Sequence, residues 1–417
     1  MHTLAKLLGY SGNNTRSLII KDASALRLAN PKIHTLLRGS RKLEFLEIHN
    51  ELEPLSVDTH QWPPTLTHLV LDQVHVPGTL WEAVAGNIEY LHLSPKAPNS
   101  AAPQLQLPVL PKLRQLHIVG TLGMLRPTVL PGTMPNLEQL WFSNLFPFAD
   151  YGIEGERTIK ETFNEVWKGM KAVIVNGHRE ILDLDQAFGF NSLVSINRGE
   201  NIRYIELVPY FDDPRGTVLL DRNRHSMELN DGSDRIMQGD LGLPNHFSNL
   251  EALRIKQTVM DGTALQPILR PALDNNRLRE LDINFRRPHF NEPEGPSSCQ
   301  HLKDYEWLRG ARSIRSMRVS NFRFTRYPRS DDQLPLPGFL ASFPNLEILE
   351  IGSEYYEDAE MCSVVVAVMK VTKLKRIYQS TIRGAPLDSL KTAAKEYGVQ
   401  LVFGDRPREW PVVFENN

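Results

Sequence analysis

The sequence has 417 residues, of which 41% are hydrophobic and 23% charged, and its formal net charge at pH 7 is −2. These proportions are typical of a folded protein rather than a disordered chain, and the near-neutral charge argues against general binding to nucleic acid or membrane surfaces. Cys299 and Cys362 are its two cysteines, which excludes a disulfide framework and a cysteine zinc site. The nucleus or the cytoplasm is therefore the expected location.

One short pattern recurs along the chain: an apolar residue, two residues of any kind, an apolar residue, one of any kind, and another apolar residue. In chain order its copies occupy residues 43–48, 66–71, 88–93, 113–118, 137–142, 170–175, 202–207, 250–255, 278–283, 314–319 and 346–351. A degenerate copy at 15–20 opens the series, and 374–377 and 399–403 close it. The alternation of apolar and other residues predicts a short strand in each copy.

The spacing of the copies predicts the fold. First residues at 43, 66, 88, 113 and 137 are 23, 22, 25 and 24 residues apart, within the range of about 20–29 residues of leucine-rich repeats. The asparagine or cysteine usual eight residues after the first leucine is absent, since Glu51, Val74 and Thr121 stand there. We predict an α/β fold, a curved and irregular leucine-rich-repeat solenoid of about a dozen repeats with a parallel inner sheet, forming a single domain over residues 1–417.

The segments between the strand copies predict helices or irregular turns on the convex side. Apolar residues at helical spacing predict helices over residues 157–170, 263–273, 361–371 and 387–397. Long insertions, polar or rich in proline, are expected near residues 94–108, 210–245 and 286–298.

Residues 386–417 are expected to form a C-terminal cap or tail. This segment contains Trp410, Val412, Val413 and Phe414, which together are too apolar for a free tail. We expect these four side chains to pack back on the repeats, either as a cap or along the concave face.

Catalytic motifs do not occur in the sequence. It contains no GxxxxGK[ST], no GxGxxG after a strand, no HExxH and no GxSxG. We therefore expect neither enzymatic activity nor a cofactor. Histidines lie in four successive strand copies, but their positions within the repeat differ and no cysteine or carboxylate completes a set of ligands, so no metal site is expected.

Side chains at positions three, five and seven of each copy are expected on the concave face of the sheet. From these positions we predict a partner-binding surface that consists of Phe45, His68, Tyr90, His92, His117, Trp141, Tyr204, Arg254 and Arg318. Exposed aromatic and arginine side chains supply most interface hot spots. Arg254 and Arg318 have no core role in this register, so their charge is expected to select an acidic partner.

Several stretches give the chain a resemblance to a known family. Residues 135–138 and 344–347 both read Pro-Asn-Leu-Glu. Residues 36–48 and 398–411 carry the same resemblance. In these stretches the chain resembles the leucine-rich-repeat region of fungal F-box proteins. The resemblance implies that the repeats recognise the substrate of a cullin–RING ubiquitin ligase, the SCF complex, in ubiquitin-dependent protein degradation, with chromatin or replication proteins as substrates.

The resemblance does not extend to the F-box, the segment that binds the ligase adaptor. Residues 15–20 already read as a repeat strand, so the adaptor is an expected partner only where an F-box lies upstream. The alternative is a leucine-rich-repeat scaffold or regulator without ligase function. In both cases we expect a monomer that binds a protein on its concave face and binds neither nucleic acid nor a membrane.

Overall fold

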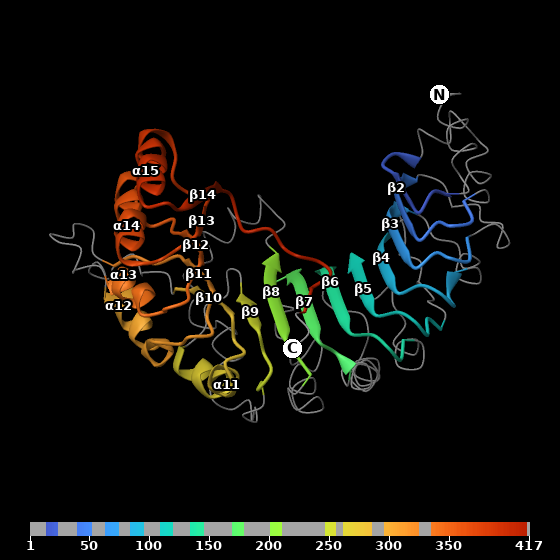
Figure 1. Cartoon of the computed structure of the whole chain (residues 1–417), viewed down its shortest axis with the longest axis horizontal. Helices are drawn as coiled ribbons and strands as arrows, with labels where there is room; N and C mark the ends of the chain where they lie inside the picture. The colour runs from blue at the N-terminus through green and yellow to red at the C-terminus, as the bar shows by residue number, and fades with distance from the viewer. Residues whose placement is uncertain are drawn as a thin grey trace. The chain divides into compact units, whose positions relative to one another are not determined.

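The computed structural model describes residues 14–23, 40–51, 63–74, 84–95, 109–119, 134–145, 169–178, 201–210, 247–255, 262–285, 296–324 and 335–414. The strands in these ranges form one open parallel sheet of 14 strands, which follow one another in chain order (Figure 1). The predicted α/β class with a parallel sheet is therefore confirmed. No helix in the described ranges is long and apolar enough to cross a membrane.

The chain divides into two compact units. The first consists of residues 1–197 and 210–212, and the second of residues 198–209 and 213–417. A single domain over residues 1–417 stays a prediction.

Each strand of the first unit lies within one of the predicted copies or extends from it. The strands are β1 (Ser17–Ile20), β2 (Phe45–Glu51), β3 (His68–Val74), β4 (Tyr90–Pro95), β5 (Gln115–Val119), β6 (Gln139–Leu145) and β7 (Ala172–His178). Each pairs in parallel with the next, and residues at the same position of two copies stand opposite each other. Of the predicted helix at 157–170, only residues 169 and 170 lie within the described ranges.

In the second unit, helices lie between successive strands from β9 to β14. Its strands are β8 (Tyr204–Tyr210), β9 (Ala252–Ile255), β10 (Glu280–Asn284), β11 (Ser316–Ser320), β12 (Ile348–Gly352), β13 (Arg376–Gln379) and β14 (Gln400–Phe403). Its helices are α11 (Gly262–Asp274), α12 (Pro296–Lys303), the 3-10 helix η8 (Glu306–Leu308), α13 (Pro335–Ala341), α14 (Asp358–Val371) and α15 (Gly384–Glu396). Helices predicted at 263–273, 361–371 and 387–397 are thus confirmed.

The expected insertions fall largely outside the described ranges, including most of 94–108 and 210–245. The third expectation, 286–298, is wrong at its end, because α12 begins at Pro296. The sequence pattern suggested a loop there because three prolines occur close together, but a proline is well tolerated in the first turn of a helix, where its missing N–H has no partner to bind.

In the copies from residues 43–48 to 346–351, positions one, four and six supply the core wherever their side chains are described. In the copy around β10, Leu278, Leu281 and Ile283 are at most 1% exposed, and Leu43, Leu46 and Ile48 around β2 are at most 2% exposed. Burying each such side chain contributes roughly 1.5–3 kcal/mol. Because these copies place their apolar side chains on the same face, the core continues from strand to strand within each unit.

Asparagines directly before a strand copy tie that copy to the preceding one. Asn87 Nδ2 donates to the Pro64 carbonyl oxygen at 2.7 Å, and Asn136 does the same to Pro111. In the second unit, Asn345 Nδ2 donates to the Arg312 carbonyl oxygen at 2.7 Å. These bonds satisfy backbone carbonyl groups between neighbouring copies. The asparagine usual eight residues after the first leucine is absent from this chain and cannot have this role.

We expect Asn345→Ala to lower the free energy of unfolding by about 1 kcal/mol, because it removes the donor to the Arg312 carbonyl oxygen. Chemical denaturation of the full chain measures this difference. Lys373 is exposed and precedes Leu374 as Asn345 precedes Leu346, so Lys373→Ala is the matched control, with an expected change below about 0.5 kcal/mol. Equal losses in both variants would contradict the assigned role.

Candidate protein-binding site

The first unit carries a stack of rings at position five of neighbouring strands. The register pairs His92 of β4 with His117 of β5, and His117 with Trp141 of β6. The rings of His117 and Trp141 are stacked with centroids 3.7 Å apart, and those of His92 and His117 meet edge to face at 4.3 Å. The Nδ1 atoms of the two histidines lie 2.6 Å apart and share a hydrogen bond. The three side chains therefore stand side by side, at the same position of successive copies.

A second row of rings lies at position three. Phe45 of β2, His68 of β3 and Tyr90 of β4 are paired by the strand register. Ring centroids are 6.2 Å apart between Phe45 and His68 and 5.7 Å apart between His68 and Tyr90, the latter pair stacked. The distances lie in the range at which aromatic pairs attract. Six of the predicted partner-binding residues thus form two rows on one face.

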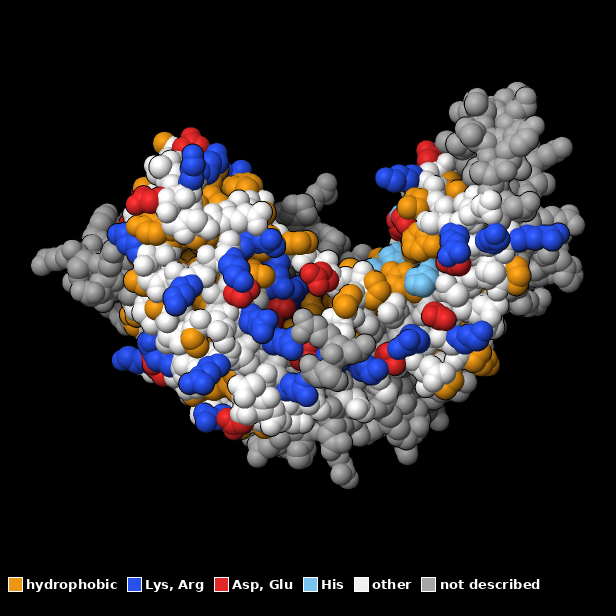
Figure 2. All heavy atoms as spheres, in the orientation of Figure 1, with side chains coloured by type: hydrophobic (Ala, Val, Ile, Leu, Met, Phe, Trp, Pro, Cys, Tyr) orange, Lys and Arg blue, Asp and Glu red, His pale blue; other side chains and the backbone are white. Residues whose placement is uncertain are grey.

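This face of the first unit is partly open to solvent. His117 is buried at 6% exposure, whereas Phe45, His68, Tyr90, His92 and Trp141 are each partly exposed. Figure 2 shows the histidine side chains beside hydrophobic ones on the surface. We call these six residues the aromatic surface.

An ionisable group borders the aromatic surface at position seven. His49 Nδ1 lies 2.9 Å from Asp72 Oδ2, and its Nε2 contacts Glu47 Oε1. Burial alone would lower the pKa of His49, but the bonds to the two carboxylates outweigh it and raise the pKa above the usual value. In contrast, burial lowers the pKa of His92. The pKa values of these two histidines are therefore shifted in opposite directions.

The second unit presents charged side chains where the first presents rings. Glu206, Arg254, Asp282, Arg318 and Glu350 stand at position five of β8 to β12, and the sign of their charge alternates from strand to strand. Parallel strands lie about 4.8 Å apart, which brings opposite charges into contact. Arg318 Nε, for example, lies 3.1 Å from Glu350 Oε1.

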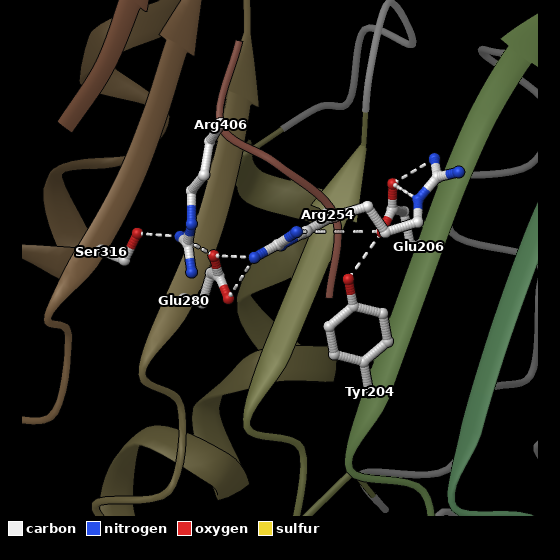
Figure 3. Close-up of polar contacts among 7 residues, drawn as sticks. Tyr204, Glu206, Arg254, Glu280, Ser316 and Arg406 are labelled. Carbon is white, nitrogen blue, oxygen red and sulfur yellow. Dashed lines mark hydrogen bonds and ion pairs between the residues drawn. The ribbon is translucent and has the colours of Figure 1, made fainter. Parts of the chain in front are cut away.

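Arg254 lies between two glutamates (Figure 3). Its Nη2 is 2.9 Å from Glu280 Oε1, and its Nη1 is 4.0 Å from Glu206 Oε2. The Tyr204 hydroxyl donates to Glu206 Oε2 at 2.6 Å. The Arg254 and Glu206 side chains are only 9% and 1% exposed, so water and salt screen these charges little.

The segment that follows β14 supplies two further arginines to this face. Figure 1 draws it in red, crossing back over the strands of the second unit. Arg406 Nη1 donates to Glu280 Oε1 and to the Ser316 hydroxyl (Figure 3). Arg408 donates to Glu206 Oε1 from Nε at 2.8 Å and from Nη2 at 2.6 Å. We call residues 404–414 the tail and the charged side chains of β8 to β12 beneath it the charged surface.

The apolar residues of the tail differ in their packing. Trp410, Val412 and Phe414 are partly buried, and the Phe414 ring lies 4.4 Å from the Arg203 guanidinium carbon. Val413 is 82% exposed, so the expectation that it packs back is wrong. Its neighbours Val412 and Phe414 are partly buried, so the side chains of the tail do not all lie on one side of the chain.

Three predicted partner-binding residues of the second unit are placed differently from expectation. Tyr204 and Arg254 are buried, at 6% and 7% exposure, and Arg318 is paired with Glu350. The expectation that the two arginines carry charge available to an acidic partner is wrong, because glutamates on neighbouring strands already neutralise them. Whether any of the nine predicted residues contacts a partner stays a prediction.

The environment of the charged surface moves two carboxyl pKa values in opposite directions. Burial would raise the pKa of Glu206, but the hydrogen bonds and charge of Arg408 outweigh burial and hold it below the usual value. Burial raises the pKa of Asp282 to about 7, an effect that nearby Arg318 only partly offsets. Asp282 therefore exchanges its proton near neutral pH while Glu206 stays ionised.

Sequence reasoning missed the tail arginines. The prediction for residues 386–417 rests on apolar residues alone and does not consider Arg406 and Arg408. Two features indicate a role for these arginines. The charged surface has more carboxyl than guanidinium groups, and the Arg-x-Arg spacing of the tail places both guanidinium groups on one side of an extended chain.

Within the described ranges, no group of three or more histidine, cysteine, aspartate or glutamate side chains is placed to hold a metal ion. No protein-family model and no curated protein matches the sequence.

We expect Asp282→Asn to change how stability depends on pH. The pKa of Asp282 is raised from 3.8 to about 7 in the folded chain, so the stability gained from its protonation is complete below 3.8 and is lost as the pH rises through about 7. The asparagine amide cannot ionise, so the variant does not lose this stability as the pH rises. The free energy of unfolding of Asp282→Asn, relative to that of the unmodified chain, should therefore be higher at about pH 8 than at about pH 5.

Denaturant unfolding at the two pH values measures this gain. Asp388→Asn, at an exposed site on α15, is the control and should show the same difference from the unmodified chain at both. A constant difference for Asp282→Asn as well would contradict the assigned titration.

Proposed function

We propose that the chain is a leucine-rich-repeat protein that binds a protein partner through the aromatic surface of its first unit. The repeat assignment is supported by the strand in every copy and by the spacing of 22 to 25 residues between the copies of the first unit. A parallel sheet built from such copies presents one side chain per strand at each position, which suits a long binding surface.

The observation that carries the proposal is the row of His92, His117 and Trp141. Their rings are held in place by stacking and by the shared hydrogen bond, so little conformational entropy is lost when a partner covers them. Trp141 and His92 remain partly exposed. Rigid, partly exposed aromatic side chains at the centre of a surface are typical of interface hot spots.

We further propose that the bound partner is the substrate of a cullin–RING ubiquitin ligase and that the chain acts as its receptor in the nucleus or cytoplasm. This step is supported by the resemblance to fungal F-box proteins in residues 36–48, 135–138, 344–347 and 398–411. Chromatin or replication proteins are the proposed substrates. Co-purification of the ligase adaptor and cullin with the full-length gene product tests the assignment, and their absence would favour a scaffold or regulator outside the ligase.

We expect Trp141→Ala to weaken partner binding by about 2 kcal/mol, or roughly 30-fold, while the chain stays folded. Affinity purification of the tagged full chain, with quantification of each co-purified protein, measures the loss, and circular dichroism checks the fold. Phe403→Ala removes an aromatic side chain that is 54% exposed on β14 and serves as the matched control.

Two outcomes would contradict the proposal. If Trp141→Ala unfolds the chain, the indole is part of the core rather than of a binding surface. If it stays folded and retains every protein that the Phe403→Ala chain retains, the partner binds elsewhere.

A further inference from the structure

We propose that the charged surface of the second unit is a binding site for an extended peptide with two arginines separated by one residue, and that the tail occupies this site from within the same chain. The site is additional to the aromatic surface, and the proposal does not depend on what that surface binds. Its ligand class is basic, the opposite of the acidic partner expected for Arg254 and Arg318.

The balance of charge on this surface is the first argument. On β8 to β12 the surface carries four carboxyl groups, Glu206, Glu280, Asp282 and Glu350, and two guanidinium groups, Arg254 and Arg318. Asp282, with its pKa of about 7, is only partly ionised at neutral pH, so the three glutamates exceed the two guanidinium groups by one charge. The tail contributes two arginines, which contact Glu280 and Glu206. Because the glutamates are largely shielded from water, an unmatched carboxylate here would be costly, so the surface requires a cationic occupant.

The geometry of the contacts is the second argument. Both Nε and Nη2 of Arg408 donate to a single oxygen of Glu206, and the Glu206 side chain is 1% exposed. Arg406 divides its Nη1 between a carboxylate and the Ser316 hydroxyl. A planar guanidinium group has several donors in a fixed arrangement and can make these hydrogen bonds together. The ammonium group of lysine is a compact point charge and lacks this arrangement. The surface therefore selects arginine.

The conformation of the tail is the third argument. Exposure alternates along it, with Asp405, Pro407 and Glu409 exposed and Arg406 and Arg408 partly buried between them. This is how an extended peptide lies on a surface, with every second side chain in contact. The tail also does not cover the end of the sheet, since Phe403 on the last strand is 54% exposed. It behaves as a ligand of the charged surface rather than as a cap.

Competition between the tail and an added peptide tests the proposal. The probe is a fluorescein-labelled peptide with the sequence of residues 403–414, and the protein is the full chain, unmodified or with Arg406→Ala and Arg408→Ala. A tethered segment acts at an effective concentration in the millimolar range, so the unmodified chain should bind the probe at least about tenfold more weakly than the double variant. Fluorescence anisotropy measures both affinities.

Two controls locate the binding. Glu206→Gln and Glu280→Gln, added to the double variant, should abolish probe binding, whereas Glu396→Gln, at an exposed site on α15, should leave it unchanged. A probe with alanine in place of both arginines should not bind. Equal affinity for the unmodified chain and the double variant, or binding that survives the loss of the probe arginines, overturns the proposal.

A measurement on the unmodified chain decides the question even where the double variant fails to fold. The unlabelled peptide, added above the millimolar effective concentration of the tail, should displace the tail and accelerate amide hydrogen exchange in residues 405–414. Exchange in β3, which belongs to the first unit, should not change. Unaltered exchange in residues 405–414 would show that peptide and tail do not share a site.

Discussion

In-register pairing of parallel strands is the constraint on which the rest of the structure depends. At each step within a unit, a given position of one copy stands opposite the same position of the next, as Leu281 stands opposite Met317 and Asp282 opposite Arg318. Apolar positions then form a continuous core, and the alternate positions form rows on the other face. A row of rings or a row of charges is therefore a direct consequence of which residue each copy carries at one position.

This dependence explains what could be predicted from the sequence. A strand copy is a local pattern, and each of the copies contains a strand in the structure. Helices such as α14 also follow from local spacing of apolar residues. The neighbours of His117 could be predicted because they are the residues at position five of the copies before and after it, and the ring stack follows from that register.

The charged surface could not be predicted in the same way. The prediction that the charge of Arg254 is available to a partner considers this arginine by itself. In the structure, the neighbouring strands bring Glu206 and Glu280 to it. The contact of Arg408 with Glu206 joins residues 202 positions apart, and no repeat period indicates it. Tyr204 and Asp282 are also buried, although their positions within the copies predict that they lie on the concave face.

The contact between the tail and β8 also bears on how the second unit unfolds. A stack of repeats with contacts between neighbours alone behaves as a one-dimensional chain, which can fray from its end one repeat at a time. Arg406 and Arg408 join the segment after the last strand to β10 and β8, and so close a loop around the strands between them. Fraying of β14 must break these ion pairs first, which makes the unit more cooperative. A peptide that displaces the tail would open the loop and allow the end of the unit to unfold separately.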